Sequence, residues 1–504
     1  MFPATLLILM AGSVAAAFFG LLDERVGSRS KEVFSSIILA IALYTLYNLY
    51  VAVDGGVVVF TIGAGPPLAA CFEVDALSIF MAACTVFLAL LCTVYSARYM
   101  EHDTRLAEYY SLLLSMTAGM VGVAFAGDIF TLFVFWELMC ISSYVLVAFR
   151  KERWAPIEAG FKYLIMSAIG ATMILFGMAF LYGMTGTLNF AQMSETLSEV
   201  SGGFWMLVAF AALFIGFGIK AAVVPMHTWL PDAHPEAPSP ISAMLSGMVI
   251  ETGLYGFIRL LYVVFIPNAA MVDGGLATFK VTVGFFAAVT MIVGNVMALL
   301  QKDIKRLLAY SSIAQIGYML IGVAAATEFG LRGCFLHVLN HSLMKGLAFL
   351  AAGAIVHQLG TRNLDEIKGV GKRMPITMMT LTIAVLGLGG VPGTAGFISK
   401  FILSASAVGA GMPILTVLGV LNSAFSMAYY LPMLKNLVTT PTRDFSQVKE
   451  APASMLVPMC IMAALIILIG IYPAPAVQFA HMASEAVTTK LSTYIEAIVR
   501  AILG

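Results

Sequence analysis

The chain has 504 residues, of which 61% are hydrophobic and only 11% are charged, and its formal net charge at pH 7 is zero. This composition excludes a water-soluble domain, and the balanced charge excludes a protein that binds nucleic acid electrostatically. We therefore expect an all-α, polytopic membrane protein that lies in the lipid bilayer.

A helix that spans the bilayer needs roughly 20 apolar residues. The first apolar run lacks the basic region of a cleavable signal, so we expect it to be the first membrane helix. In chain order this rule predicts fourteen segments, at about 4–21, 33–52, 76–97, 109–126, 129–149, 159–183, 204–226, 240–265, 279–300, 306–325, 333–357, 376–405, 411–435 and 453–473.

Basic residues lie unevenly between these segments. Loops after odd-numbered segments hold 18 Lys and Arg residues, whereas those after even-numbered segments, with nearby helix ends, hold only Arg259, Lys280 and Arg332. Because Lys and Arg favour the cytoplasmic side, both termini are expected outside the cell. Apart from two basic residues in the C-terminal tail, the rest lie within predicted membrane segments: Lys162, Lys220, Lys345 and Lys400.

Charged side chains inside a membrane cost about 2.5 kcal/mol or more, so they usually face a partner or a cavity and serve function. Glu137 and Glu251 are the acidic residues that lie deep in predicted segments. A static ion pair with a lysine is the structural alternative for Glu137. Lys162 lies near the start of its segment, where a lysine can also reach the membrane surface.

Two stretches recur with one offset. "DIFTLFVFWELMCISSY" near residue 128 resembles "DIKRLLAYSSIAQIGY" near 303, and "GTLNF" at 186–190 resembles "GTRNL" about 174 residues later. The offset spans five segments, an odd number, so the second copy enters the membrane from the opposite side. We expect three helices in 1–105, inverted five-helix repeats in 106–266 and 278–437, and a last helix with a short tail in 438–504.

The seventh and twelfth segments each combine a lysine with helix breakers. Lys220 is followed by Pro225, and "GLGGVPGTAGF" precedes Lys400. Irregular backbone at membrane depth persists only where protein or a watery cavity satisfies its polar groups. Both segments are therefore predicted to be broken helices. A lysine beside such a break can release a proton when a nearby carboxylate moves away, which an arginine would not do.

His337, His341 and Lys345 recur every four residues and so share one helix face. Histidine titrates near neutral pH, so this face could carry protons between the two broken helices. Ordinary core histidines and a zinc site are the alternatives. We expect no metal, because neither a carboxylate nor a cysteine completes a ligand set.

Three further residues could support the path or its mouth. His227 and His234 lie at the break of the seventh segment and in the loop after it, and could equally be ordinary loop residues. Ser246 could line the path, although serines in membrane helices often bond their own backbone.

The cysteines are scattered through apolar runs without a CxxC pair, so we expect no iron–sulfur cluster, haem, disulfide or other cofactor. They are Cys71, Cys84, Cys92, Cys140, Cys334 and Cys460.

Four motifs in order, "PMHTWLPDAHPEAPSPISAMLSG", "DIKRLLAYSSIAQIGY", "HVLNHSLMKGLAFL" and "GFISKF", cover much of the fourth to thirteenth segments. They resemble the antiporter-like subunits shared by respiratory complex I, Mrp-type sodium/proton antiporters and membrane-bound energy-converting hydrogenases. The resemblance implies a fourteen-helix, inverted-repeat proton or ion channel. It also implies that Glu137 and Lys220 form a pair, and that the path continues through His341, Lys345 and Lys400.

The sequence departs from that family in one important place. Many members have a lysine in a pattern like "SGxxxKxGxYGxxR", where this chain reads "SGMVIETGLYGFIR" with Glu251. A carboxylate can still relay a proton, but the usual transfer between two lysines would become one from lysine to glutamate. After the last segment we expect only a short, amphipathic tail, without the long lateral helix of the largest members.

The favoured function is a proton-translocating subunit of a multi-subunit redox-driven complex, like complex I or an energy-converting hydrogenase. The alternative is a subunit of an Mrp-type sodium/proton antiporter without a redox partner. A structural scaffold would have no reason to carry the intramembrane charges. No redox catalysis is expected in this chain itself. Its expected partners are other membrane subunits and a peripheral redox module, in the plasma membrane of a prokaryote.

Overall fold

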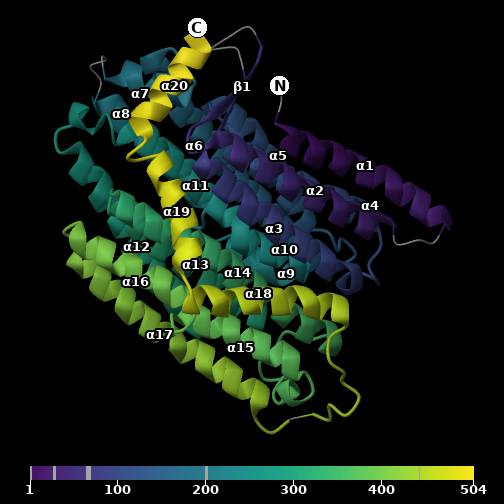
Figure 1. Ribbon diagram of the computed structural model, residues 1–504. Coiled ribbons are helices and arrows are strands. Elements are labelled where there is room, and N and C mark those ends of the chain that lie inside the picture. The colour runs from purple at the N-terminus through teal and green to yellow at the C-terminus, as the bar shows by residue number, and fades with distance from the viewer. Residues whose placement is uncertain (1–2, 27–29, 64–69, 199–202, 442, 504) are drawn as a thin grey trace.

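The computed structural model describes residues 3–26, 30–63, 70–198, 203–441 and 443–503. Over these residues the chain is nearly all helical (Figure 1). The helices of the first half are α1 (Ala4–Val26), α2 (Ser30–Val53), α3 (Ala76–Tyr99), α4 (Leu106–Phe125), α5 (Ile129–Val147), α6 (Trp154–Thr185), α7 (Phe190–Leu197), α8 (Gly203–Lys220), α9 (Leu230–Glu236), α10 (Ser239–Met244) and α11 (Ile250–Leu260).

The π-helical turn η1 (Leu245–Val249) joins α10 to α11, and the π-helical turn η2 (Leu261–Phe265) continues α11, so that residues 239–265 form one continuous run. The 3₁₀ turns are η3 (Ala269–Met271) and η4 (Val370–Lys372). The remaining helices are α12 (Gly275–Leu299), α13 (Ile304–Ala324), α14 (Glu328–Leu359), α15 (Pro375–Gly389), α16 (Ala395–Gly409), α17 (Pro413–Val438), α18 (Ala453–Ile471), α19 (Ala474–Ala486) and α20 (Leu491–Leu503).

Twelve of the predicted segments coincide with helices that are long and apolar enough to cross a membrane within the described residues. Of the other two, segment 4–21 corresponds to α1, and segment 376–405 corresponds to the pair of short apolar helices α15 and α16. The chain is therefore a multi-pass membrane protein. The exact number of crossings stays a prediction.

One small β-hairpin departs from the expected all-α class. Strands β1 (Val58–Ile62) and β2 (Ala70–Val74) pair antiparallel, with Phe60 opposite Phe72. The hairpin lies between the second and third predicted segments. Its run "VVVFTI" is rich in β-branched residues, which favour a strand, and it is too short to span a membrane.

The centre of the molecule consists of α13, α14 and the run Ser239–Phe265, which are almost completely buried. Figure 1 shows α1, α2 and α4 on one flank of this centre and α12, α16 and α17 on the other. The flanking helices expose large apolar side chains such as Tyr44, Phe285 and Ile414. Such surfaces suit contact with lipid or with other membrane subunits.

The two predicted repeats share local geometry at the start of α5 and α13. Asp128 caps α5 and bridges to Asn189, and Asp303 caps α13 and bridges to Asn363 in the same antiparallel manner. In addition, α6 and α14 have the same length, 32 residues, and each ends at a left-handed glycine. These equivalences support the internal repeat. Its boundaries and its inverted orientation remain predictions.

Candidate functional site

The first broken helix ends earlier than the sequence suggested. Helix α8 stops at Lys220 itself, six residues before the predicted limit of 226, and the chain then turns through Ala222, whose φ is 55°. A left-handed conformation at a non-glycine residue is costly and persists only where its surroundings enforce it. Here the Trp229 indole donates a hydrogen bond of 2.7 Å to the carbonyl of Ile219, which also accepts from the Ala222 amide, and this contact holds the break in place.

Lys220 is buried among polar groups from α5 and α6. Its ammonium donates hydrogen bonds to the Tyr163 hydroxyl at 2.5 Å, to the Cys140 sulfur at 3.2 Å and to the Ser143 hydroxyl at 3.4 Å. The Tyr163 ring in turn stacks on Trp229 at a centroid distance of 3.9 Å. The break therefore positions Lys220 in a pocket of neutral groups that can accept hydrogen bonds from either of its protonation states.

Glu137 does not form the direct ion pair with Lys220 that the family resemblance implies. Both residues are described, and no contact within 4.0 Å joins the carboxylate to the ammonium. The two are close enough to interact electrostatically. Glu137 lies half-buried on α5, and its Oε1 lacks a hydrogen-bond partner. The pair is thus separated in this structure and would need a side-chain movement to close.

Glu251 meets His341 at the centre of the molecule. The Glu251 Oε1 atom lies 2.6 Å from the His341 Nδ1 atom, and both side chains are completely buried. The second atoms of both groups, Oε2 of Glu251 and Nε2 of His341, have no hydrogen-bond partner. The π-helical turn η1 immediately precedes Glu251, as such turns often do at functional sites.

Helix α11, which carries Glu251, also packs against the end of α8 at Lys220. A Cβ atom at Gly253 would lie 2.8 Å from the backbone nitrogen of Ala221 and 3.1 Å from the Lys220 Cβ. Only glycine permits this close approach. The backbones of α8 and α11 therefore pack closely beside the first break, because residue 253 has no side chain.

His337 connects the central pair to the second broken helix. Its ring lies 6.1 Å from that of His341, and its Nδ1 is 2.9 Å from the Ser399 hydroxyl. Its Nε2 is 3.0 Å from Oε1 of Gln315. The Gln315 amide donates to the carbonyl of Leu388, which also accepts from Lys400 at 2.6 Å. His337 is thus linked to Lys400 through Gln315 and the Leu388 carbonyl, while Ser399 precedes Lys400 in the chain.

The second break is where the sequence predicts it. Helix α15 ends at Gly389 and α16 begins at Ala395, and the freed Leu388 carbonyl becomes the acceptor for Lys400. Lys400 also donates to the Ser423 hydroxyl at 3.1 Å and lies over the Tyr318 ring at 4.3 Å. Lys400 thus lies in α16 just after the break, and its ammonium is held at the break by a carbonyl and a hydroxyl oxygen.

Lys345 lies on the same face of α14 but turns toward α13. Its ammonium donates to the Leu308 carbonyl at 2.9 Å and to the Ser311 hydroxyl at 2.6 Å. Ser311 contacts the Tyr430 hydroxyl on α17. Lys345 is therefore a side branch of the file that runs from Glu251 to His337, rather than a link between them.

Of the residues predicted to support the path or its mouth, Lys162 and His227 reach the surface, whereas His234 lies in the core. Lys162 is about half exposed and forms ion pairs with Glu158 at 2.9 Å and with Asp232 at 3.0 Å, so it lies at the surface of the bundle. His227 is partly exposed and its Nδ1 has no partner. His234 is fully buried, its two ring nitrogens have no partner, and it stacks on Phe349.

Ser246 pairs with a serine of the second repeat. Its hydroxyl lies 2.6 Å from that of Ser312, which in turn bonds to the carbonyl of Leu308. Ser246 therefore connects η1 to α13 close to Lys345, which donates to the same Leu308 carbonyl. Its role in lining a path stays a prediction.

Lys305 is a functional candidate that the sequence analysis missed. Sequence counted it among the cytoplasmic loop residues, but it is 2% exposed and donates to the carbonyls of Pro235 and Ala237 in the segment after the first break. It lines a polar pocket of about 420 Å³ with Glu236 and Arg362. The run "DIKRLL" opens a helix, and a lysine in the first turn of an otherwise buried helix is the signal that could have found it.

Tyr163 is a second missed residue. It lies 174 residues before His337, and each packs against a tyrosine, Tyr144 or Tyr318, at a centroid distance of 6.2 Å. The two repeats thus place a titratable or hydroxyl-bearing ring beside the lysine of each break.

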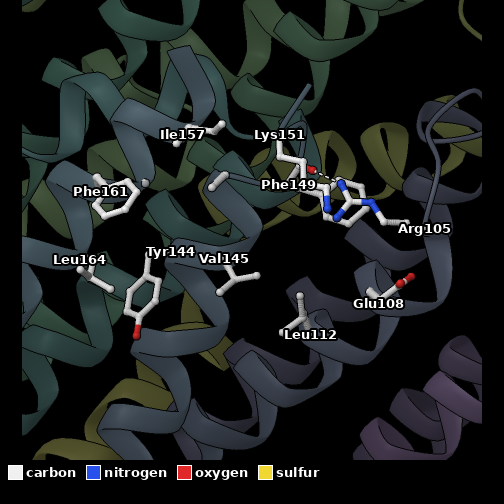
Figure 2. A pocket seen from close by; sticks show the side chains of 12 residues that line it. Arg105, Glu108, Leu112, Tyr144, Val145, Phe149, Lys151, Ile157, Phe161 and Leu164 are labelled. Carbon is white, nitrogen blue, oxygen red and sulfur yellow. Dashed lines mark hydrogen bonds between the residues drawn. The ribbon is translucent and has the colours of Figure 1, made fainter. Parts of the chain in front are cut away.

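An apolar pocket of about 440 Å³ lies between α4, α5 and α6 (Figure 2). Figure 2 shows Tyr144 and Leu164 at one end of the pocket and Arg105 and Glu108 at the other. None of the predicted path residues lines it. The pocket therefore belongs to the lateral surface of the bundle and not to the polar file.

Among the described residues, no group of three or more His, Cys, Asp or Glu side chains is placed to hold a metal ion. All six cysteines are free, and five of them are buried. The histidines at 337 and 341 contact a serine, a glutamine and a glutamate, which is a hydrogen-bonded arrangement.

Two known protein families match this chain. Residues 126–426 match the family described as NADH:quinone oxidoreductase/Mrp antiporter, transmembrane. Residues 64–110 match the family described as NADH-ubiquinone oxidoreductase (complex I), chain 5 N-terminus.

Two curated relatives cover most of the chain. It is 34% identical over 421 residues to the F(420)H(2) dehydrogenase subunit N of Methanosarcina mazei, which covers 82% of this chain and 84% of that protein. It is 33% identical over 427 residues to the NADH-quinone oxidoreductase subunit N of Desulforudis audaxviator, with 81% and 83% covered.

Solved structures share the fold along nearly the whole chain. A chain of the membrane-bound sulfane sulfur reductase, an archaeal respiratory membrane complex, superposes with a TM-score of 0.88 at 28% identity, covering 97% of this chain and 99% of that one. A chain of the Mrp complex from Dietzia sp. gives 0.84 at 25% identity, with 97% and 99% covered. A chain of respiratory complex I from Thermus thermophilus gives 0.74 at 27% identity, with 95% and 99% covered.

Proposed function

This chain belongs to the NADH:quinone oxidoreductase/Mrp antiporter transmembrane family, and from that premise we propose that it is the proton-translocating subunit of a multi-subunit, redox-driven membrane complex. The observation that carries the proposal is the buried contact of 2.6 Å between Glu251 and His341, in a chain that also places a buried lysine, Lys220 or Lys400, beside each of two helix breaks. Ionisable groups are costly in a membrane and are kept where they move charge.

Each residue of the proposed path has a role that follows from its contacts. Lys220 gains or loses a proton according to the position of the Glu137 carboxylate, because an approaching negative charge favours the ammonium form. Glu251 and His341 share one proton across their contact, since either can hold it while the other accepts the hydrogen bond. His337 then presents its two ring nitrogens to Ser399 and Gln315, the neighbours of Lys400.

Unpartnered polar atoms support proton movement through this file. Oε2 of Glu251, Nε2 of His341 and Oε1 of Glu137 are all without a protein partner. Buried polar groups are normally satisfied by protein or water. We propose that water molecules occupy these positions and complete the connection from Glu137 to Lys220 and onward to Glu251.

The redox-driven reading is supported by the names of the relatives. Both curated relatives described above are subunits named for dehydrogenase or oxidoreductase complexes. By analogy this chain would work with other membrane subunits and a peripheral redox module, while holding no redox group itself. The second candidate function, a subunit of an Mrp-type sodium/proton antiporter, is favoured by the similarity to the Mrp complex chain.

The proposed setting follows the distribution of basic loops. We place the chain in the plasma membrane of a prokaryote with both termini outside, so that protons enter from the cytoplasmic side near Glu137 and Lys220 and the file ends at Lys400. His234 and Lys305, beside the polar pocket on the side with most basic loops, provide a second group of entry residues.

Purification of the tagged chain from its native membrane in a mild detergent, with mass spectrometry of the bound subunits, tests the assignment. Iron–sulfur or nickel–iron subunits in stoichiometric amounts are the expected result. Recovery of only small membrane subunits would overturn the redox-driven reading and favour the antiporter.

A further inference from the structure

A second row of polar side chains leaves the central pair along α11. Glu251, Tyr255 and Arg259 recur every four residues, so they share one face of the helix, and all three are buried. This row leads from the contact with His341 to the end of the run Ser239–Phe265 that lies opposite most of the basic loops. None of the roles assigned above uses Tyr255 or Arg259.

Arg259 ends this row in a buried ion pair. Its guanidinium donates to Oδ2 of Asp75 at 2.5 Å, and the two side chains are 0% and 3% exposed. Oδ1 of Asp75 accepts from the Ser78 hydroxyl at 2.9 Å, and Ser78 also lies beside Tyr255. The Nε and Nη2 atoms of Arg259 have no partner. Because a buried guanidinium requires hydrogen-bond acceptors, these free donors point to water at this site.

Glu73 on β2 completes the cluster. Its Oε1 accepts from the Asn189 amide at 2.8 Å, and its Oε2 contacts the Tyr494 hydroxyl of α20. The Tyr494 ring lies under the Arg259 guanidinium at 5.0 Å. Burial raises the pKa of Glu73 to about 7, against the lowering effects of Tyr494 and Arg259. The titratable or charged groups near Glu73 are Cys71, Asp75, Asp128, Arg259 and Tyr494.

The cluster reaches the surface through a small pocket. Asp75 and Tyr494 line a pocket of about 50 Å³ together with Gly55 and Lys490, between the end of α2 and the C-terminal helices. Figure 1 shows α20, α7 and β1 gathered at this end of the molecule. The pocket thus joins a buried, proton-binding cluster to the outside of the protein.

We propose that Glu251, Tyr255 and the cluster of Asp75, Arg259, Glu73 and Tyr494 form a proton outlet that branches from the central file, with Glu73 as the group that releases the proton. The proposal rests on the proposed proton-translocating function and adds to it a route that does not pass through Lys400.

Proton transfer along this row creates no net charge. The Tyr255 hydroxyl donates to the Ala124 carbonyl at 2.8 Å in this structure and has to turn toward Ser78 to take part. It then accepts a proton from Glu251 through water and gives its own to the Ser78 hydroxyl, which passes one to Asp75 in the same way. Water in the pocket that Asp75 and Tyr494 both line carries the proton to the Tyr494 hydroxyl, which gives its own proton to Glu73. Arg259 keeps its proton throughout, because its guanidinium does not deprotonate in proteins. Its fixed positive charge balances one of the two carboxylates, so the cluster can hold a single exchangeable proton.

The test uses the intact complex that contains this chain, reconstituted in one orientation in proteoliposomes. A potassium diffusion potential set with valinomycin drives protons toward the side that carries α20, and a pH-sensitive dye reports the flux. The variants are Glu73→Gln, Tyr255→Phe and Tyr494→Phe. Glu195→Gln on α7 is the matched control, because Glu195 is an exposed carboxylate at the same end of the molecule.

The wild-type flux should rise between pH 6 and pH 8 on the release side with a midpoint near 7, where Glu73 titrates. Glu73→Gln and Tyr255→Phe should lower the flux at least tenfold. Tyr494→Phe, the mildest change, should shift the midpoint, and Glu195→Gln should match the wild type. A structural role for the cluster would not move this midpoint.

Normal flux and an unchanged midpoint in Glu73→Gln and Tyr255→Phe, in complexes where Lys220→Ala still blocks transport, would overturn the outlet and leave the proposed function standing. If Lys220→Ala also has wild-type flux, the proposed function itself fails. Should Glu73→Gln prevent assembly, Tyr255→Phe and Tyr494→Phe decide the question in the same two ways.

Discussion

The Glu251 carboxylate and the His341 imidazole meet at 2.6 Å in the completely buried centre of the molecule. Glu251 stands where many members of the resembled family have a lysine. The contact explains how an acidic residue is accommodated there, because the imidazole provides both a hydrogen-bond partner and a proton acceptor. The substitution therefore changes the charge at this position while keeping a group that can exchange a proton.

Removing the charge at residue 251 should impair transport. Glu251→Gln keeps a hydrogen bond to His341 but cannot take up a proton, so we expect proton flux to fall at least tenfold. Glu251→Lys should be partly tolerated, since a lysine can also relay a proton. Flux measurements on reconstituted complexes check this. Equal flux in the wild type and Glu251→Gln would show that residue 251 carries no proton.

Replacing Lys400 with arginine should block transport while keeping a positive charge. The guanidinium can donate to the Leu388 carbonyl as the ammonium does, but it does not deprotonate in proteins. We expect Lys400→Arg to assemble normally and to lose most of its redox-driven proton flux. Because the proposed outlet branches off before Lys400, a residual flux through that branch is also expected. Lys435→Arg, at the end of α17, is the control and should be active.

The cap of α5 should contribute measurably to stability. The Asp128 side chain accepts hydrogen bonds from the amides of Thr131 and Cys71. Asp128→Ala removes both acceptors and should destabilise the fold by about 1 kcal/mol or more, whereas asparagine is an equally good cap. Thiol-reactive dye unfolding suits this chain, because five of its cysteines are buried. Equal melting temperatures for Asp128→Ala and Asp128→Asn would contradict this role.

Sodium should not be required for transport. The proposed path consists of lysine, histidine and glutamate, and the Glu251 carboxylate contacts a nitrogen of His341. Sodium binding needs several oxygen ligands, as hard cations do. Proton flux measured across a range of sodium concentrations should stay constant. A flux that saturates with sodium would favour the antiporter function.

The positions of the membrane helices, and most of the charged residues that lie buried between them, could be predicted from the sequence because both depend on local composition. Apolar length located the membrane helices, and the cost of a buried charge singled out Lys220, Glu251 and Lys400. The contact between Glu251 and His341 could not be predicted from spacing, since the two residues are 90 positions apart on different helices. Its geometry depends on how α11 packs against α14.

The structure differs from the sequence-based predictions at three other places, and each difference depends on contacts made after folding. The first break begins after Lys220 and not at Pro225, because Ala222 turns left-handed and Trp229 binds the Ile219 carbonyl. Lys305 was counted with a loop because the predicted segment begins at residue 306, yet the segment after the first break folds over it. The separation of Glu137 from Lys220 depends on side-chain positions that a motif does not specify.

The most direct test of the central claim is the redox-driven proton flux of the intact complex with Lys220→Ala, compared with Lys162→Ala. Lys220 is buried at the first break, whereas Lys162 is about half exposed and pairs with surface carboxylates. We predict that Lys220→Ala abolishes the flux while the complex stays assembled, and that Lys162→Ala changes it less than twofold. Wild-type flux in an assembled Lys220→Ala complex would contradict the proposed path.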